Sequence, residues 1–458
     1  MDTRIRDPLL ALLMAALWAP WSGGAPLTAQ EAPARVVSLA ELFAAADTGN
    51  AEIRAARRTA EASFARVPQA GALPDPTLGL GLVNFPLADP SFREEMMTMT
   101  QLQLGARVPW PGRRGLRERA AEARARSADW EVAQVQDRVH EEISTVWARL
   151  YYVDRAIEIT EENESLLADL TRASTADLSV GRSSQPDVLR AQVERAGLAD
   201  QLLALRQERT ALIARLAALI GDRDATFEVR PELAPEIVAA ATTASAPRSS
   251  FAAVEVTERA AGDEETGEGP IPSVAELRNT ALHANPMLLA HQERVAAQER
   301  VVDLARIAKK PDVNFSVAYS YRSGFADFFN FVVSAPLPIF SGRKQDQAVI
   351  EEGAVLGQHT ARHHQMVDEL NAEIATLWSE LQRTRDQIAL LREGILPQAR
   401  TALASSSSSY RVGRVDFSTL IDAQVDLYRH ELHHHRLLAD FATKLAALER
   451  AVGTEVLR

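Results

Sequence analysis

The sequence lacks several features that would assign a chemistry directly. It contains no cysteine, which excludes a disulfide framework, a thiol nucleophile and a cysteine-ligated metal. Its net charge of −12 and the absence of a basic stripe exclude nucleic acid as a partner. No nucleophile and base pair, phosphate loop or metalloprotease motif is present, so we expect no enzyme and no cofactor. No apolar run reaches the roughly twenty residues that a membrane-spanning helix needs.

The N-terminus carries the tripartite pattern of a secretory signal peptide. Two arginines precede an apolar run at 9–18, and small residues follow in SGGAPLTAQ. Roughly ten apolar residues are too few to cross a bilayer. We therefore expect residues 1–29 to form a signal peptide, with cleavage after Ala25 or Ala29.

The rest of the chain repeats one pattern twice. SLAEL at Ser38 returns as SVAEL at Ser273, and VGRSSQPDVLRAQVE at Val180 returns as VGRVDFSTLIDAQVD at Val412. The distances between the copies are nearly equal, which indicates a duplication rather than chance matches. The pattern predicts a first repeat, a linker rich in Ala, Ser, Pro and acidic residues, and a second repeat, at 36–230, 231–272 and 273–456.

Each repeat contains a predicted β-hairpin, at about 76–108 and about 312–337. The runs are about ten residues long and have one apolar face and one Asn, Ser, Gln or Gly face, as membrane strands do. A half-buried soluble sheet would show the same period. Four strands do not close a barrel, which needs about eight or more, so membrane strands would require several chains to share one barrel. The apolar positions include Leu78, Leu80, Leu82, Leu102, Leu104, Val317, Tyr319, Phe329 and Phe331.

Long helices follow each hairpin, which makes the predicted fold mixed α/β and mainly α. No proline and no further glycine interrupts the chain between Gly115 and about Ala176, enough for roughly 90 Å of helix. Leucines at alternating steps of four and three along 187–220 indicate coiled-coil packing. We therefore predict long helical hairpins at about 113–220 and about 342–456.

Together these features resemble the TolC family of outer membrane efflux proteins. The resemblance rests on LPDP before the first strand, PWPGRRG after the second, APLPIFSGRK after the fourth and VGR at both helical hairpins. PWPGRRG is also similar to members that work with heavy-metal exporters of the resistance-nodulation-division type. The resemblance implies a homotrimer with a 12-stranded β-barrel in the outer membrane of a Gram-negative bacterium, continued by an α-helical tunnel in the periplasm.

The implied function is a passive exit duct that works with a periplasmic adaptor protein and an inner membrane efflux pump. The similarity of PWPGRRG suggests heavy-metal cations as the cargo, with drugs, dyes or a secreted protein as the open alternatives. Outer membrane lipid would surround the barrel. The competing interpretation is a periplasmic coiled-coil adaptor or scaffold with a soluble β-sheet.

In the family that the sequence resembles, the adaptor docks at the two hairpin tips. A glycine there would also end a helix in a left-handed cap, which explains the glycines but not the repeated valine and arginine. The matching positions are Val180, Gly181, Arg182, Val412, Gly413 and Arg414.

The resemblance also implies an acidic ring at the periplasmic mouth. Asp422 matches one ring position, and Asp187 stands in the first copy where Thr419 stands in the second. Three symmetric carboxylates would attract cations and make opening depend on pH and divalent ions. Asp422 could equally be a solvated helix residue, and Asp187 a helix N-terminal cap.

Histidine spacing suggests a weaker metal hypothesis. His430 and His434 are four residues apart, so one helix face could present both rings to a transition metal. His359, His363 and His364 lie upstream. A conduit must release what it carries, so a solvated surface is the favoured interpretation.

Overall fold

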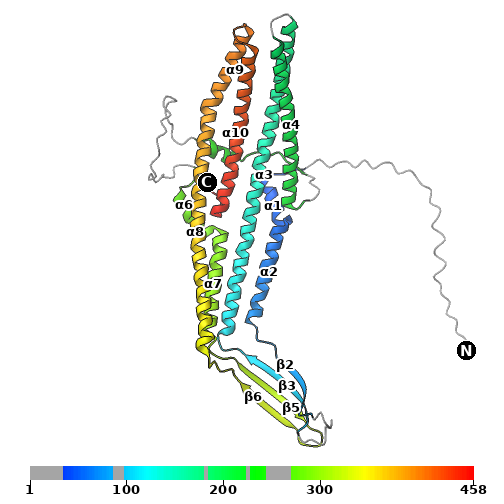
Figure 1. Ribbon diagram of the computed structural model, residues 1–458, viewed down its shortest axis with the longest axis vertical. Helices are drawn as coiled ribbons and strands as arrows, with labels where there is room; N and C mark the ends of the chain where they lie inside the picture. The colour runs from blue at the N-terminus through cyan, green and yellow to red at the C-terminus, as the bar shows by residue number, and fades with distance from the viewer. Residues whose placement is uncertain (1–34, 86–96, 180–183, 223–226, 244–269, 458) are drawn as a thin grey trace, which may run out of the picture.

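The computed structural model describes residues 35–85, 97–179, 184–222, 227–243 and 270–457. Long helices run from a small sheet at one end to two helical hairpins at the other (Figure 1). The predicted signal peptide and the first hairpin tip lie outside the described residues. No helix among the described residues combines the length and the apolarity needed to cross a membrane.

The main sheet consists of four antiparallel strands in the order β2, β3, β5 and β6. Its register places Leu80 opposite Leu102, Leu102 opposite Tyr319 and Tyr319 opposite Phe329. Alternate residues of a strand point to opposite faces, so these four side chains share one face. The strands are β2 (Thr77–Val83), β3 (Met99–Val108), β5 (Val313–Tyr321) and β6 (Phe328–Ser334).

Two helices precede each pair of strands, and the first helix of each pair begins with the same capping interaction. Ser38 accepts a hydrogen bond from the backbone N–H of Glu41, whose side chain accepts one from the N–H of Ser38 at 2.9 Å. Ser273 and Glu276 form the same capping box in the second half. The helices are α1 (Leu39–Gly49), α2 (Ala51–Gly71), α6 (Val274–Ala284) and α7 (Pro286–Ile307).

An asparagine at each helix junction is buried, and both the oxygen and the nitrogen of its side-chain amide make hydrogen bonds. The side-chain oxygen of Asn50 caps α2, and its amide nitrogen donates to the carbonyl of Leu219 at 2.7 Å. Asn285 caps α7 and donates to the carbonyl of Ala451 at 2.8 Å. Each asparagine therefore ties a short helix pair to the end of a long helix more than 160 residues away in sequence.

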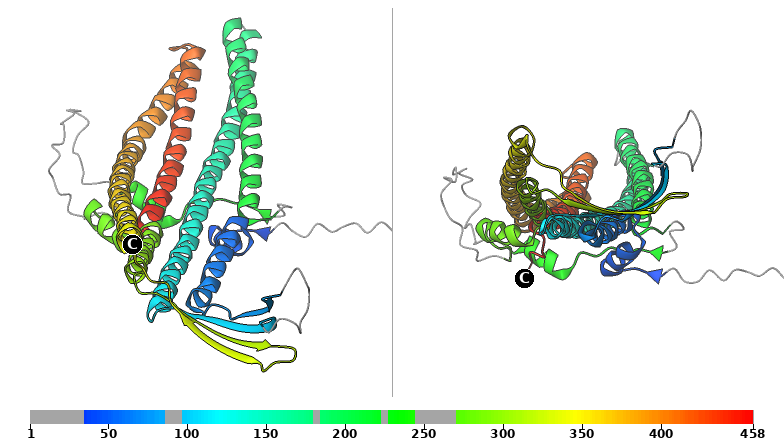
Figure 2. Two further views of the ribbon diagram at one scale, coloured as in Figure 1. Left: turned by 60° about the horizontal axis from the view of Figure 1, so that its bottom comes forward. Right: turned by 90° about the horizontal axis from the view of Figure 1, so that it is seen from below.

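The long helices form two hairpins that stand side by side and follow an arc when seen from below (Figure 2). At 67 residues, α3 is about 100 Å long. The second long helix contains a π-helical segment, which lies just before Pro397. Proline has no N–H and crowds the preceding turn, which accounts for the break. The elements are α3 (Arg113–Ser179), α4 (Gln185–Ile220), η1 (Ser341–Arg343), α8 (Gln345–Leu390), η2 (Leu391–Ile395), α9 (Leu396–Arg411) and α10 (Phe417–Val452).

The leucine seam predicted along 187–220 is buried between these helices, and a similar apolar seam along α8 is buried as well. Each seam is interrupted by one polar residue, Arg209 in α4 and Thr384 in α8, and both residues make specific contacts. Arg209 pairs with Asp154 of α3 at 2.7 Å, and Thr384 accepts a hydrogen bond from Lys444 of α10 at 3.1 Å. Buried seam residues include Leu198, Leu202, Leu205, Leu216, Leu219, Ile374, Leu381, Ile388 and Leu391.

The described part of the predicted linker contains a helix, α5 (Pro235–Thr242). Ala240 and Ala241 are buried, and Ile237 packs against the main core cluster. Just before α5, the carbonyl of Glu232 accepts a hydrogen bond from Trp147 of α3 at 2.9 Å. β4 (Phe227–Glu228), which shortly precedes α5 in the chain, pairs in parallel with β1 (Arg35–Val36) near the N-terminal end of the described residues.

Candidate channel and docking sites

The apolar face of the sheet is exposed. Leu80 is 77% exposed and Phe329 is 72% exposed, although both are large hydrophobic side chains. Leu102 and Tyr319, between them in the same row, are about half exposed. A water-soluble sheet would bury such a face against another layer. An uncovered apolar face of this extent marks contact with lipid or another apolar partner.

The two outer strands of the sheet each have one unpaired edge. In the chain β2 pairs only with β3, and β6 pairs only with β5, among the described strands. Unpaired backbone groups are costly in an apolar medium, because no water is present to bind them. The sheet therefore requires partners at both edges if its apolar face meets lipid.

Asp312 joins the sheet to the helices. Its side chain, 2% exposed, accepts hydrogen bonds from Arg107 at 2.7 and 3.0 Å, from the backbone N–H of Trp110 at 3.0 Å, and from Arg113. Burial alone would raise the pKa of Asp312, but the Trp110 N–H and the two guanidinium groups hold that pKa below its ordinary value. The carboxylate thus binds the end of β3 and the start of α3 to the start of β5.

The second hairpin tip lies at the end of the helices opposite the sheet (Figure 1). Gly413 has a φ of +71°, and its N–H donates to the carbonyl of Tyr410 at 2.9 Å. The N–H of Arg414 donates to the carbonyl of Ser409 at 2.9 Å, which completes a Schellman cap. The cap explains Gly413, whereas Val412, 67% exposed, and exposed Arg414 are not required by it.

The two predicted gate residues have different surroundings. Asp422 on α10 is exposed and pairs with Arg190 on α4 at 2.5 Å, which links the two hairpins near their tips. Asp187 belongs to a capping box: Ser184 is the N-cap of α4 and donates from its hydroxyl to Asp187 at 2.6 Å. The sequence had allowed Asp187 itself as the cap, but Asp187 lies three residues inside the helix.

The two α10 histidines that the sequence suggested as a metal pair, His430 and His434, have different surroundings in the structure. His434 packs against His435 with ring centroids 5.4 Å apart. The Tyr151 hydroxyl lies 3.0 Å from Nδ1 of His435. Burial, with His434 and Arg155 nearby, lowers the pKa of His435 to about 4. His430 is partly exposed, and within the described ranges no set of three or more His, Asp or Glu residues is already placed to hold a metal ion.

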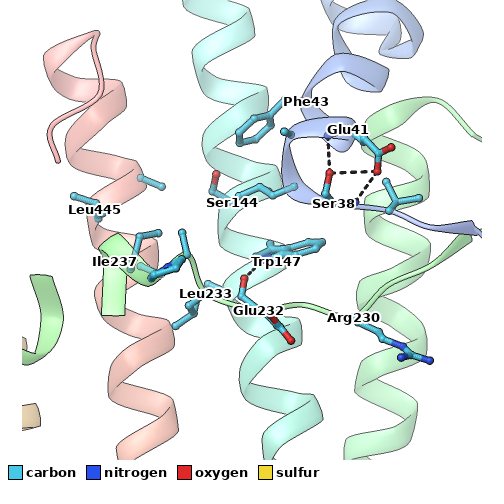
Figure 3. Close-up of a pocket in the computed structure, with 18 of the residues that line it drawn as sticks. Ser38, Glu41, Phe43, Ser144, Trp147, Arg230, Glu232, Leu233, Ile237 and Leu445 are labelled. Carbon is cyan, nitrogen blue, oxygen red and sulfur yellow. Dashed lines mark hydrogen bonds between the residues drawn. The ribbon is translucent and has the colours of Figure 1, made fainter. Parts of the chain in front are cut away.

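A hollow of about 590 Å³ lies beside the middle of α3 (Figure 3). Its lining is mainly apolar and comes from the start of α1, from α3, from α10 and from the segment around α5. Trp147 spans this region and donates to Glu232, as Figure 3 shows. The sequence did not predict this hollow, because the lining residues come from four separated parts of the chain.

The sequence also missed the Asp312 cluster. Arg113 lies in PWPGRRG and Asp312 just before a predicted strand, so both flank elements that the sequence did predict. Only the pairing of β3 with β5 brings them together.

Comparisons with known proteins agree with this geometry. The family model described as outer membrane efflux protein matches residues 277–454. The cobalt-zinc-cadmium resistance protein CzcC of Cupriavidus metallidurans is 20% identical over 435 residues, 93% of this chain and 92% of CzcC. The outer membrane efflux protein BepC of Brucella suis biovar 1 is 22% identical over 312 residues, 66% of this chain. The match spans 60% of BepC, less than two thirds of that relative.

The fold is shared with solved channel structures. CusC, whose structures concern transmembrane channel formation, aligns with a TM-score of 0.72 at 15% identity and covers 91% of this chain and 92% of its own. A mainly helical chain with a small, outward apolar four-stranded sheet is thus the fold that this chain shares with these channel structures. The match of residues 277–454 to the outer membrane efflux protein model, together with the similarity to CzcC, confirms the resemblance seen in the sequence.

Proposed function

We propose that this protein is the outer membrane exit duct of a tripartite efflux system and passively conducts substrates from the periplasm to the exterior. The observation that carries the proposal is the exposed apolar face of the four-stranded sheet, joined directly to helices about 100 Å long. A sheet that meets lipid and helices that reach far into the periplasm are the two parts that such a duct needs.

The duct is a homotrimer. Four strands per chain are too few to close a barrel, and three chains supply twelve. In this arrangement the free edge of β2 in one copy pairs with the free edge of β6 in the next, so no edge faces lipid. The helices of one chain follow an arc (Figure 2), which is one third of the tunnel wall in the trimer.

The two halves of the chain are copies of one unit of a β-hairpin and a long helical hairpin. Equivalent contacts support this proposal. Ser38 and Ser273 form the same capping box, and Asn50 and Asn285 make the same two kinds of hydrogen bond. Trp147 and Trp378 each donate to a backbone carbonyl at one end of the linker at 231–272, Trp147 to Glu232 at 2.9 Å and Trp378 to Pro272 at 3.1 Å.

The hairpin tips bind the periplasmic adaptor protein. Val412 and Arg414 are exposed at the end farthest from the sheet, beyond what the helix cap requires. Their counterparts in the first copy are Val180 and Arg182, with Gly181 between them. The adaptor in turn connects the duct to an inner membrane efflux pump, which supplies the energy.

Asp422 takes part in the periplasmic gate through its pair with Arg190. The contact joins α10 to α4 close to the tips, so its loss would remove one link between the two hairpins. Because both side chains are about half exposed, the pair contributes little free energy and opens readily, which suits a gate. Asp187 serves α4 through its capping box, and we assign it a secondary place in the gate.

Heavy-metal cations are the proposed substrates. The similarity to CzcC, a cobalt-zinc-cadmium resistance protein, and PWPGRRG in the sequence support this class. Deleting the gene and measuring survival on metal salts and on organic toxicants tests it. Sensitivity to drugs alone would contradict the metal assignment.

A pair of neighbouring substitutions tests the lipid-facing sheet. Leu102 lies on the apolar face of β3, and Gln103 on the opposite face. Arginine in contact with lipid costs about 2–4 kcal/mol at the bilayer midplane, whereas positions facing the lumen tolerate it. We expect Leu102→Arg to reduce the heat-modifiable trimer in outer membrane fractions and Gln103→Arg to retain it. Equal behaviour of the two variants, or recovery of the wild type as a salt-extracted periplasmic monomer, would reject the proposal.

A further inference from the structure

Three histidines that the duct does not require meet between α7 and α8. His291 of α7 is 3% exposed and stacks on His363 of α8, with ring centroids 5.7 Å apart and an interplanar angle of 16°. His359, one turn before His363 on α8, has its ring centroid 5.9 Å from that of His291. The two helices thus bring three imidazoles to one place.

Two of these rings have a buried nitrogen without a partner. Nδ1 of His291 and Nδ1 of His363 are both shielded from solvent and make no hydrogen bond in the described structure. A buried polar atom without a partner destabilises the folded protein, because it has given up its hydrogen bonds to water. Such atoms in native proteins usually bind something, either an ordered water or an ion. Two of them on neighbouring rings indicate a shared ligand.

The surrounding contacts hold the two helices in register. Two turns further along α7, Gln298 donates to the Glu352 carboxylate of α8 at 2.6 Å. Arg294, the nearest cation on α7, is engaged by Glu131 of α3. The distance between the imidazoles is therefore fixed by the packing of the helices rather than by the rings themselves.

Positive charge close to the three rings is partly neutralised. Arg294 and Arg362 lie near His291 and would repel a cation. The ion pair of Arg294 with Glu131 of α3 reduces that repulsion.

We propose that His291 and His363 bind one divalent transition-metal ion such as Zn²⁺ between α7 and α8, with His359 as a third ligand. Three imidazoles and a water form a common tetrahedral zinc site. Because no three such side chains in the described residues are already placed around an ion, His359 must rotate about its side-chain bonds to join the other two. The ion acts as a clamp between two helices and is not the transported substrate.

The histidines of α10 do not offer an equivalent site. Tyr151 contacts Nδ1 of His435, and Arg392 and Arg400 place positive charge near His434. Only the pair between α7 and α8 combines facing rings with two unpartnered nitrogens among the described residues.

Direct binding tests the site. Full-length, tag-free protein is purified in detergent, stripped with a chelator, titrated with Zn²⁺, desalted, and analysed for retained metal. We expect one ion per chain in the wild type and at least tenfold weaker binding in His291→Ala and in His363→Ala. His283→Ala changes an exposed histidine at the end of α6 and is the matched control, with unchanged binding expected.

Two further measurements separate a site from a folding defect or surface binding. Co²⁺ should give the visible absorption of a tetrahedral site in the wild type, and His291→Gln, which keeps a polar side chain in the core, should abolish it while preserving the trimer. Zn²⁺ should raise the thermal midpoint of the wild type but not of His291→Gln. The proposal would be overturned if the wild type retained no metal after desalting, or if all variants bound Zn²⁺ equally. Because the readout is binding by the purified protein, failure here leaves the duct function untouched.

Discussion

Asp312 offers the sharpest test of how the sheet is attached to the helices. Replacing it by alanine removes the carboxylate that Arg107, Arg113 and the Trp110 N–H share. The Arg113 side chain is only 12% exposed, so the variant leaves a largely buried cation without its partner. Removing one member of a buried ion pair costs about 3–5 kcal/mol.

Two features bring the expected loss toward the lower end of that range. Arg107 is 58% exposed, so water replaces its lost contact. Arg113 keeps hydrogen bonds to the carbonyls of Ile307 and Lys310, at 3.2 and 2.9 Å. We therefore expect Asp312→Ala to lower the free energy of unfolding by about 3 kcal/mol.

The assay is denaturant-induced unfolding of the detergent-solubilised protein, followed by helical circular dichroism. Asp346→Ala is the matched control, because Asp346 pairs with Lys309 nearby but both side chains are about half exposed. Such a surface pair contributes less than about 1 kcal/mol. Equal losses in the two variants would refute the buried-charge argument.

The same residue predicts a dependence on pH. The pKa of Asp312 lies below its ordinary value of 3.8 in the folded protein, so the stabilisation is complete above that value and is lost as the pH falls through the folded pKa. The difference between wild type and Asp312→Ala should therefore be constant from pH 5 to 7 and should shrink in stronger acid. A difference that grows on acidification would contradict the lowered pKa.

Three other outcomes are expected. Asn50→Ala and Asn285→Ala should each cost roughly 2–3 kcal/mol in denaturant unfolding, because each loses a helix cap and leaves a buried carbonyl unpaired; markedly unequal losses would argue against equivalent roles. The free energy of unfolding should fall on the order of 2 kcal/mol between pH 6.5 and about 4, because His435 takes up a proton in the unfolded chain while it is still neutral in the folded protein. His435→Gln should flatten this dependence of stability on pH. Gly413→Ala should lower the free energy of unfolding by about 1 kcal/mol, because Gly413 has a left-handed backbone conformation. Comparing the amount of adaptor pulled down by a folded Gly413→Ala trimer with the amount pulled down by Val412→Asp separates the capping role of the tip from its docking role.

Much of the fold follows from local patterns. Alternating apolar residues such as Leu102 and Leu104 define strands, and the lack of proline and glycine after Gly115 allows one very long helix. Ser38 and Ser273 mark helix starts because capping involves residues only three apart. The sequence also predicted the family, since its short motifs lie at the ends of these elements.

The break in the second long helix shows where local reasoning falls short. Pro397 is visible in the sequence, but a proline either kinks a helix or ends it. The structure continues the helix through a π-helical segment at Leu391–Ile395, because the flanking residues Ile388 and Leu396 are buried in the core. Packing on both sides decided the outcome.

By itself, the sequence determined the four main strands, the long helices, their order and the face of each main strand that is apolar, because these depend on neighbours a few residues apart. Tertiary structure alone decided which distant groups meet. Asp312 reaches Arg107 only because β3 pairs with β5, and His291 reaches His363 only because α7 packs on α8. Such contacts join residues some 70 to 200 positions apart, so their geometry comes from helix and strand packing rather than from any periodicity in the chain.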